Sequence, residues 1–93
     1  MFKVNEYFSG SVKSIAFKAG NLPATVGVMA KGDYEFGTST IEEMTLVSGK
    51  WSIQLPGSDK WINPGKGETF TVPKDSKFKL KVAEESAYLC VYK

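Results

Sequence analysis

The chain has 93 residues, with twelve lysines, ten acidic residues and no histidine, which gives a net charge of +2. A chain of this length suits one domain that buries roughly 60–65% of its unfolded surface, so we expect residues 1–93 to form a single domain. The nearly balanced charge argues against a protein whose main task is to grip nucleic acid. The absence of histidine excludes a zinc site built from cysteine and histidine.

Cysteine content and the first residues bear on the compartment. Cys90 is the single cysteine, which excludes an internal disulfide. No apolar run reaches transmembrane length, and residues 1–6 turn polar at once, unlike a secretory leader. We therefore expect a cytoplasmic protein with no membrane association.

Alternation of apolar and polar residues in short runs predicts strands throughout the chain. These strands lie on either side of the break at residues 9–10 and over 24–30, 34–37, 42–47, 51–55, 69–72, 77–82 and 88–92. Turn-forming residues separate them at 20–23, 31–33, 38–40, 48–50, 56–59, 73–76 and 83–86. We expect 31–33 to be a tight hairpin, 48–50 to reverse the chain, and 61–62 to form a short element.

The clearest strand is 77–82, where three lysines alternate with Phe78, Leu80 and Val82. One face should therefore be buried and the other solvated. No segment shows a period of 3.6 residues, and glycine and proline recur between the runs. Eight or nine short strands of this kind predict an all-β, antiparallel barrel or sandwich.

Two spacings resemble the sequence motifs of cupins. Gly67 and Pro73 match the second motif in residue and spacing, and Glu42 followed by Gly49 fits the end of the first. Phe78 stands where that motif has a metal-binding histidine. The resemblance implies a small cupin-like, jelly-roll barrel without the cupin metal site, and we expect no metal cofactor.

The whole chain resembles the pyrimidine/purine nucleoside phosphorylases, which are small cupins. The matching segments keep a consistent order and lie at residues 5–10, 12–15, 26–29, 34–36, 42–45, 48–49, 55–56, 70–73, 76–82 and 88–92. The resemblance implies phosphorolysis, in which a nucleoside and inorganic phosphate give a free base and a pentose 1-phosphate. Phosphate would then be a co-substrate, and a wide range of bases would be accepted.

Phosphorolysis passes through a cationic sugar centre, which a nearby carboxylate can stabilise. Glu42 and Glu43 are neighbours on one strand, so they point to opposite faces and only one can face the interior. The cupin correspondence and the shared parity with Met44 and Leu46 favour Glu42. The alternative is that both carboxylates lie in solvent, because charged side chains are mostly exposed.

The base, the sugar and phosphate need further partners. Tyr34, Phe36 and Phe78 are candidates for stacking the base, although packing in the core is the commoner role of such residues. Candidates for binding phosphate are Ser39 and Thr40, or alternatively Lys13. Gln54 and Tyr92 are candidates for binding substrate through their polar ends, which can face into the barrel or out of it. Cys90 is expected to be a small buried residue rather than a nucleophile, since no histidine is present to activate it.

Two other functions remain open. One is a non-enzymatic cupin-like module that binds a sugar or a nucleotide, and turnover alone separates it from the enzyme. The other is a nucleic-acid-binding barrel, which the alternation of lysines with buried positions over residues 74–81 disfavours. We also expect a homodimer, because small barrels have exposed edges and Tyr7, Phe8, Trp51 and Trp61 are many aromatic residues for one core.

Overall fold

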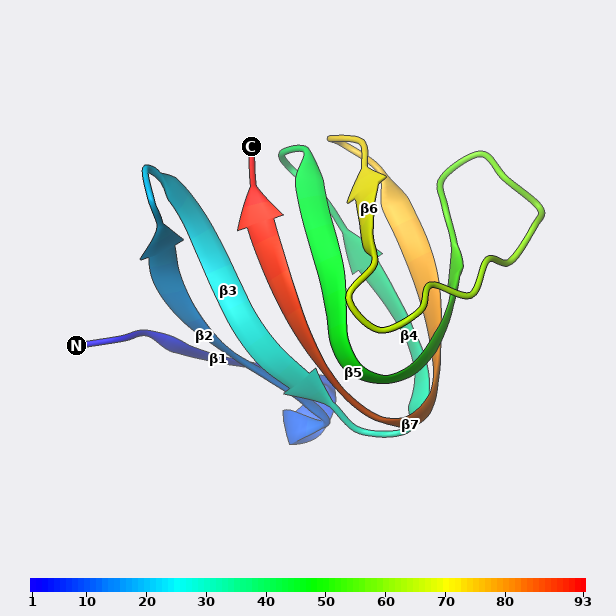
Figure 1. Cartoon of the computed structure of the whole chain (residues 1–93), viewed down its shortest axis with the longest axis horizontal. Coiled ribbons are helices and arrows are strands. Elements are labelled where there is room, and N and C mark those ends of the chain that lie inside the picture. Colours follow the sequence, from blue (N-terminus) through cyan, green and yellow to red (C-terminus); the bar gives the residue numbers. More distant parts are fainter.

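The computed structural model describes all 93 residues and is all-β, as the sequence predicts. Every strand pair is antiparallel, and one short 3-10 helix follows the first strand (Figure 1). The structure contains no helix that is long and apolar enough to cross a membrane. The elements are β1 (Val4–Tyr7), η1 (Phe8–Gly10), β2 (Val12–Ala19), β3 (Leu22–Met29), β4 (Gly32–Gly37), β5 (Glu42–Gln54), β6 (Thr69–Val72) and β7 (Lys77–Tyr92).

The fold is built on the pairing of β5 with β7, which have 13 and 16 residues and curve together (Figure 1). The last part of β7 pairs with β3, whereas its first part pairs with β4. The strand order is β1-β2-β3-β7-β5-β6, and β4 pairs with β7 off this path. The two long strands therefore pass from one wall of the domain to the other, and the inner faces of the two walls enclose the core.

A close approach of two backbones marks the bend. The register between β5 and β7 shifts three times between Leu46 and Trp51. Gly49 has a φ of +112°, and a Cβ built on it would lie 2.6 Å from the Cα of Ser86. The Ser86 hydroxyl accepts a hydrogen bond from the Lys50 amide at 3.3 Å and donates one to the Glu84 carbonyl at 2.8 Å. A glycine at this bulge lets both strands bend without separating.

The expected turn at 48–50 and the expected loop at 83–86 are therefore wrong, because both segments lie within continuous strands. Bulges allow a strand to bend sharply while it keeps its partner, so turn-like residues do not always end a strand. The tight hairpin at 31–33 is also wrong, since β3 and β4 pair with different parts of β7 and not with each other. Residues 22–23 belong to β3, and the β2–β3 connection is shorter than predicted.

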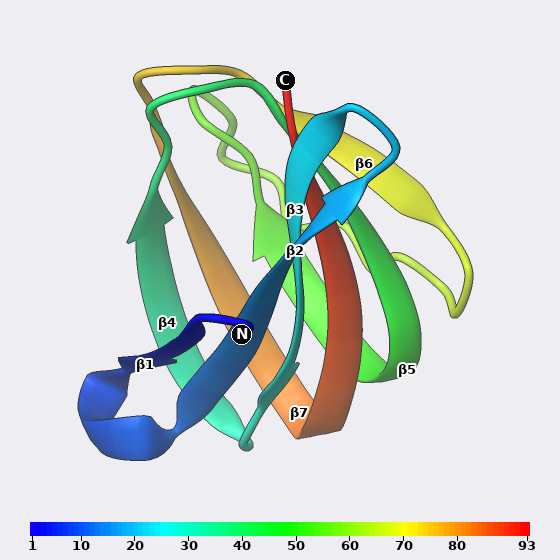
Figure 2. The same ribbon diagram turned by 90° about the vertical axis from the view of Figure 1, so that its left-hand side faces the viewer.

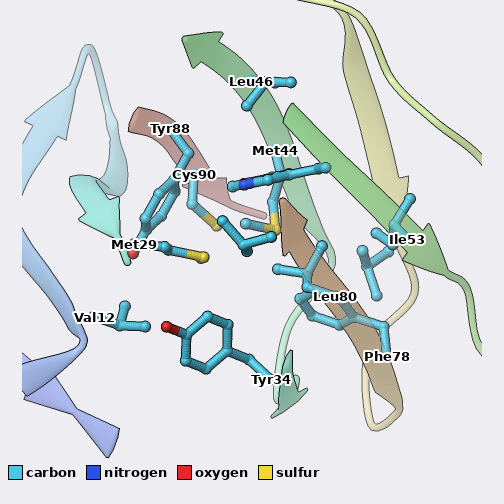
Figure 3. Packing of buried hydrophobic residues seen from close by; sticks show 13 residues of the cluster. Val12, Met29, Tyr34, Met44, Leu46, Ile53, Phe78, Leu80, Tyr88 and Cys90 are labelled. Atoms are coloured by element: carbon cyan, nitrogen blue, oxygen red, sulfur yellow. The ribbon is translucent and has the colours of Figure 1, made fainter. Parts of the chain in front are cut away.

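Thirteen buried residues form one hydrophobic core between the two walls (Figure 3). Phe78, Leu80 and Val82 are buried and the lysines between them are exposed, which confirms the alternation read from residues 77–82. Trp51 is only 1% exposed and packs against Tyr88, with ring centroids 5.9 Å apart. Trp51 is therefore part of the core and not a surplus surface aromatic.

Aromatic rings join the N-terminal segment to β4. Phe8 in η1 lies with its ring centroid 5.0 Å from that of Tyr34 and 5.5 Å from that of Phe36. In Figure 2 η1 and β4 lie on the same side of the domain, although no backbone ladder joins them. This contact covers one side of the core where the two walls are not hydrogen-bonded to each other.

The bend at Gly49 gives a test of the fold. Gly49→Ala adds a Cβ against the backbone of Ser86 at a positive φ, and we expect it to lower the free energy of unfolding by about 3 kcal/mol or more. Gly57→Ala is the matched control, because Gly57 has a φ of +75° but nothing within 4 Å of a built Cβ. The control should cost about 1 kcal/mol. Urea denaturation measures both, and equal losses would show that the contact with Ser86 is unimportant.

Candidate functional site

A cavity of about 530 Å³ opens between the inner faces of the two walls. It is formed by residues from η1 and from β1, β2, β3, β4, β5 and β7, together with the loop that follows β4. Its lining residues are Tyr7, Phe8, Ser14, Met29, Glu35, Phe36, Gly37, Ser39, Glu42, Met44, Phe78, Tyr88, Cys90 and Tyr92. No lysine is among them, so the protein supplies no positive side chain to the cavity.

One wall of the cavity is aromatic. Phe36 and Phe78 are register partners on β4 and β7, and their rings stack with centroids 5.8 Å apart and an interplanar angle of 29°. Phe8 meets Phe36 edge-on at 5.5 Å. Both rings point inward, because side chains alternate along a strand and the residues on either side of each phenylalanine are exposed. A flat ligand ring can stack on such a surface.

The opposite wall carries the carboxylate of Glu42. In the ladder, Glu42 lies between Tyr92 of β7 and Val72 of β6, and it shares the inner face with Met44. Glu43 points to the other face, where its carboxylate lies 2.9 Å from the Lys93 ammonium group. The side chain that faces the cavity is therefore Glu42.

Burial raises the pKa of the Glu42 carboxyl above its usual value of 4.5. A hydrogen bond opposes this effect, because the Cys90 thiol donates to Glu42 Oε1 over 3.4 Å and favours the charged form. The pKa of the Cys90 thiol is raised, mainly by burial and further by the neighbouring carboxylate. Cys90 is thus a protonated donor at neutral pH and not a thiolate nucleophile.

Two phenols complete this wall. Burial raises the pKa of Tyr88 to about 12. It also raises the pKa of Tyr92, whose hydroxyl lies 3.1 Å from that of Thr25. Both phenols keep their protons at neutral pH and are available as hydrogen-bond donors. Figure 3 shows Tyr88 beside Cys90, with Met29 and Met44 projecting into the same interior.

The mouth of the cavity is formed by the loop between β4 and β5. The Thr38 hydroxyl donates to the Pro73 carbonyl at 2.7 Å and accepts from the Ser76 amide at 3.1 Å, so it fixes the loop to the turn before β7. Ser39, next in the chain, lines the cavity and is exposed. The Thr40 hydroxyl oxygen is buried without a hydrogen-bond partner in the protein.

Comparison with known proteins identifies the relatives of this chain. The family model described as pyrimidine/purine nucleoside phosphorylase matches residues 2–92. The chain is 60% identical to the pyrimidine/purine nucleoside phosphorylase of Pseudomonas paraeruginosa over 93 residues, which cover 100% of both proteins. It is 61% identical to the protein of that name from Pseudomonas entomophila, over 100% of this chain and 99% of the relative. The chain belongs to the pyrimidine/purine nucleoside phosphorylase family.

Solved structures agree with this fold. A crystal structure of a protein of unknown function from Vibrio parahaemolyticus is 41% identical, with a TM-score of 0.95 over 100% of this chain and 99% of the other. A cupin-2 domain from Rhodospirillum rubrum is 14% identical, with a TM-score of 0.76 over 98% of this chain and 69% of the other. The second comparison concerns the fold alone, and it confirms the cupin-like architecture predicted from the sequence.

The structure brings five of the ten candidate residues of this nucleoside phosphorylase family member to the cavity, namely Phe36, Ser39, Glu42, Phe78 and Tyr92. The other candidates lie elsewhere for identifiable reasons. Tyr34 is buried in the core and its hydroxyl donates to the Ala30 carbonyl at 2.7 Å. Gln54 lines a separate hollow near residues 55–59. Lys13 points to the outer face, where its ammonium group lies 3.6 Å from the Glu6 carboxylate. Glu43 points away from the cavity towards Lys93. Thr40 follows Ser39 in the chain but does not line the cavity.

The remaining cavity residues are not among the candidates that the sequence suggests. Tyr88 and Cys90 do carry a signal in the sequence, because both share the parity of Tyr92 on one strand. Ser14 lies on β2 and is 3% exposed, and its strand partner in β3 is Gly27, where a Cβ would lie 2.8 Å from the Tyr88 hydroxyl. Nothing in the sequence indicates that Glu35, an exposed residue between two inward aromatics, reaches the mouth.

The cavity does not fit the metal that most cupins bind. Phe78 occupies the histidine position of the motif and is 2% exposed within the aromatic wall. No group of three His, Cys, Asp or Glu side chains lies close enough to hold an ion. The neighbours of Glu42 include the Cys90 thiol and the phenols of Tyr88 and Tyr92, which keep their protons at neutral pH and are poor partners for a hard cation.

The desolvation of Glu42 has a consequence for stability. A carboxyl group whose pKa is raised on folding stabilises the protein fully at low pH, and this contribution is lost as the pH rises through the raised value. We therefore expect Glu42→Gln to increase the melting temperature at pH 7, with the gain over the wild type shrinking as the pH falls through the raised pKa of Glu42 and absent below about pH 4. Differential scanning calorimetry across this range measures the difference. Glu43→Gln, on the outer face, should give no gain, and a Glu42→Gln protein that is less stable at pH 7 would contradict the assignment.

Proposed function

We propose that the cavity containing Glu42 is where this family member carries out phosphorolysis of nucleosides. The observation that supports this is a half-buried carboxylate facing a stacked aromatic pair across one cavity. The cavity volume of about 530 Å³ lies within the usual range for ligand pockets, which is roughly 300–1,000 Å³. A nucleoside has a flat base and a hydroxyl-bearing sugar, which match an aromatic wall and a polar wall.

In this proposal the base stacks on the rings of Phe36 and Phe78. Stacking depends on the π-face that every base has, so it tolerates purines and pyrimidines alike. The cavity contributes few fixed polar groups on the aromatic side that could read the edge of a base. Breadth of substrate therefore follows from the choice of phenylalanine at both positions.

The sugar then faces Glu42 and the phenols of Tyr88 and Tyr92. The ionised carboxylate accepts hydrogen bonds from ribose hydroxyls and stabilises positive charge as it develops at the anomeric carbon. The low polarity of the site strengthens this interaction, because few other dipoles screen it. The C1′–N bond breaks with its electron pair going to the base, which takes up a proton from solvent or phosphate. The C1′–O bond to phosphate forms in the same substitution.

Phosphate binds at the mouth of the cavity in this proposal, beside Ser39, whose side chain is exposed and lines the cavity. Thr38 is committed to the turn at 73–76, and the Thr40 hydroxyl is buried outside the cavity lining, so neither side chain is offered to phosphate. Hydroxyls and backbone N–H groups can bind phosphate without a basic side chain. Lys13, the other candidate, lies on the outer face beside Glu6, which argues against it.

A turnover assay tests the activity. Purified protein incubated with phosphate and uridine or adenosine should release free base and pentose 1-phosphate, and EDTA should leave the rate unchanged. The alternative is a cupin-like module that binds sugars or nucleotides without reaction. Binding of uridine by calorimetry with no base released in the presence of phosphate would favour that alternative.

The role of Glu42 is tested by a pair of neighbouring substitutions. Glu42→Gln keeps the shape of the side chain and removes its charge, so we expect kcat to fall by one to three orders of magnitude, about 1.4–4 kcal/mol. Glu43→Gln should behave like the wild type, because Glu43 lies on the outer face beside Lys93. Loss of activity in the Glu43 variant with a silent Glu42 variant would refute the proposed role. Circular dichroism of both proteins controls for folding.

We propose further that the protein is a cytoplasmic homodimer. The outer face of β1, β2 and β3 exposes a row of aliphatic residues that follow the ladder, namely Val4, Ile15, Val26 and Val28. They surround a shallow hollow that is almost entirely apolar. Exposed apolar patches on a sheet face are typical of sites where another protein surface packs. The one free thiol, Cys90, is buried and fits a reducing compartment.

Assembly is tested by placing a charge in this patch. Val26→Glu should convert a dimer into a monomer, because a carboxylate buried at the centre of an apolar interface loses its hydration. Light scattering at micromolar concentration measures the mass. Ile62→Glu is the control, since Ile62 is as exposed as Val26, at 44%, but lies outside the patch. A monomeric wild type would disprove the dimer, and a dimeric Val26→Glu protein would disprove this interface.

A further inference from the structure

One side chain of the protein donates a hydrogen bond to the Glu42 carboxylate, which lines the cavity. The Cys90 thiol donates a hydrogen bond to Glu42 Oε1 over 3.4 Å, and no other side chain donates to either carboxylate oxygen. Glu42 lies on β5 opposite Tyr92, and Cys90 lies on β7 opposite Met44, so the two side chains are diagonal neighbours on one face. The bond therefore joins the two long strands across their shared inner face.

Cys90 is placed as a fixed donor. It is 2% exposed, and the adjacent strands hold its backbone in the ladder on both sides, opposite Met44 and Thr25. A thiol is a weak hydrogen-bond donor and no histidine exists in the chain to deprotonate it. Burial and the nearby carboxylate raise its pKa, which keeps the proton on sulfur.

We propose that Cys90 is a positioning residue for Glu42, whose thiol fixes Oε1 against β7 and leaves Oε2 for the substrate. This inference rests on the proposed role of Glu42 in phosphorolysis. Without the thiol, the carboxylate can rotate about its side-chain bonds into the cavity, and it loses its one donor from the protein. Misorientation lowers the rate of the chemical step more than it weakens binding of the substrate.

The other titratable groups around Glu42 do not replace this donor. Tyr88 and Tyr92 come from β7, Tyr7 from β1 and Glu35 from β4, and all line the same cavity. The carboxylate of Glu35 can only oppose the charge on Glu42, and no lysine lines the cavity to support it. The Tyr92 hydroxyl is paired with that of Thr25 at 3.1 Å. The thiol is thus the protein group that stabilises the charged form of Glu42.

A matched pair of substitutions tests the inference. Cys90→Ser and Cys90→Ala both remove the sulfur and differ only in whether a donor remains. We expect Cys90→Ala to lower kcat for uridine phosphorolysis about 3- to 10-fold below Cys90→Ser, with little difference in KM. The acid limb of the pH profile of kcat should lie about half a pH unit higher in Cys90→Ala, because loss of a donor to the carboxylate raises its pKa.

A second readout needs no turnover. The carboxyl carbon of Glu42, followed by NMR during a pH titration, should show a higher pKa in Cys90→Ala than in Cys90→Ser. A purely structural role for Cys90 would change stability in both variants and leave these two pKa values equal. If either protein fails to fold, Cys90→Thr and Cys90→Val form an equivalent pair that fills more of the space. In a Glu42→Gln background the difference in kcat within either pair should vanish.

The outcomes separate the inference from the function on which it rests. Equal pH profiles and equal Glu42 pKa values within a folded pair would overturn the role of Cys90 while leaving phosphorolysis intact. A wild-type protein that releases no base would overturn the proposed function, and the NMR titration would still report whether the thiol supports the carboxylate. A Glu42→Gln protein with the kcat of the wild type would overturn the assignment of Glu42 itself.

Discussion

The joint bend of β5 and β7 sets the positions of the other strands and of the cavity. The two strands stay paired while they cross from one wall to the other, and this requires a residue without a side chain where Gly49 approaches Ser86. Because both walls share these strands, residues far apart in the chain meet across the interior. Phe78 and Cys90 lie on the same strand, yet one belongs to the aromatic wall and the other to the polar wall.

The interior of this cupin-like domain is filled with rings and sulfur where a metal site would need imidazoles. Phe78 stacks on Phe36. Met29, Met44 and Cys90 contribute sulfur atoms to the opposite side (Figure 3). In such surroundings a single carboxylate is a strong electrostatic feature, because little around it screens its charge. Glu42 is desolvated as a result, and the fold bears a cost in stability for a group that can act on a cationic centre.

The distribution of charge fits chemistry that begins with a neutral nucleoside. The lysines of β7 alternate with the core residues and stay on the outer face, so the cavity contains carboxylates and no basic group. A nucleoside carries no charge, and it becomes cationic only at the sugar during bond cleavage. In the proposed reaction, the carboxylate would interact more strongly with the cationic sugar centre than with the neutral nucleoside, which is the condition for a catalytic effect.

The local features of this protein follow directly from its sequence. Alternation at 77–82 identified the buried and exposed faces, and the parity of Glu42 with Met44 and Leu46 gave the inward carboxylate. The all-β class and the resemblance to nucleoside phosphorylases also follow from residues along the chain. These properties depend on period and residue type, which are local.

The bends of the strands and the pairing between them depend on contacts that form only in the folded chain. Ser48-Gly49-Lys50 and the segment 83–86 have the composition of turns, but pairing between β5 and β7 holds both segments in the ladder. The contact of Cys90 with Glu42 and the position of Glu35 at the mouth arise from strand neighbours separated by tens of residues. A local pattern specifies which face a side chain takes, whereas the partner across that face depends on the register of strands that the chain brings together only on folding.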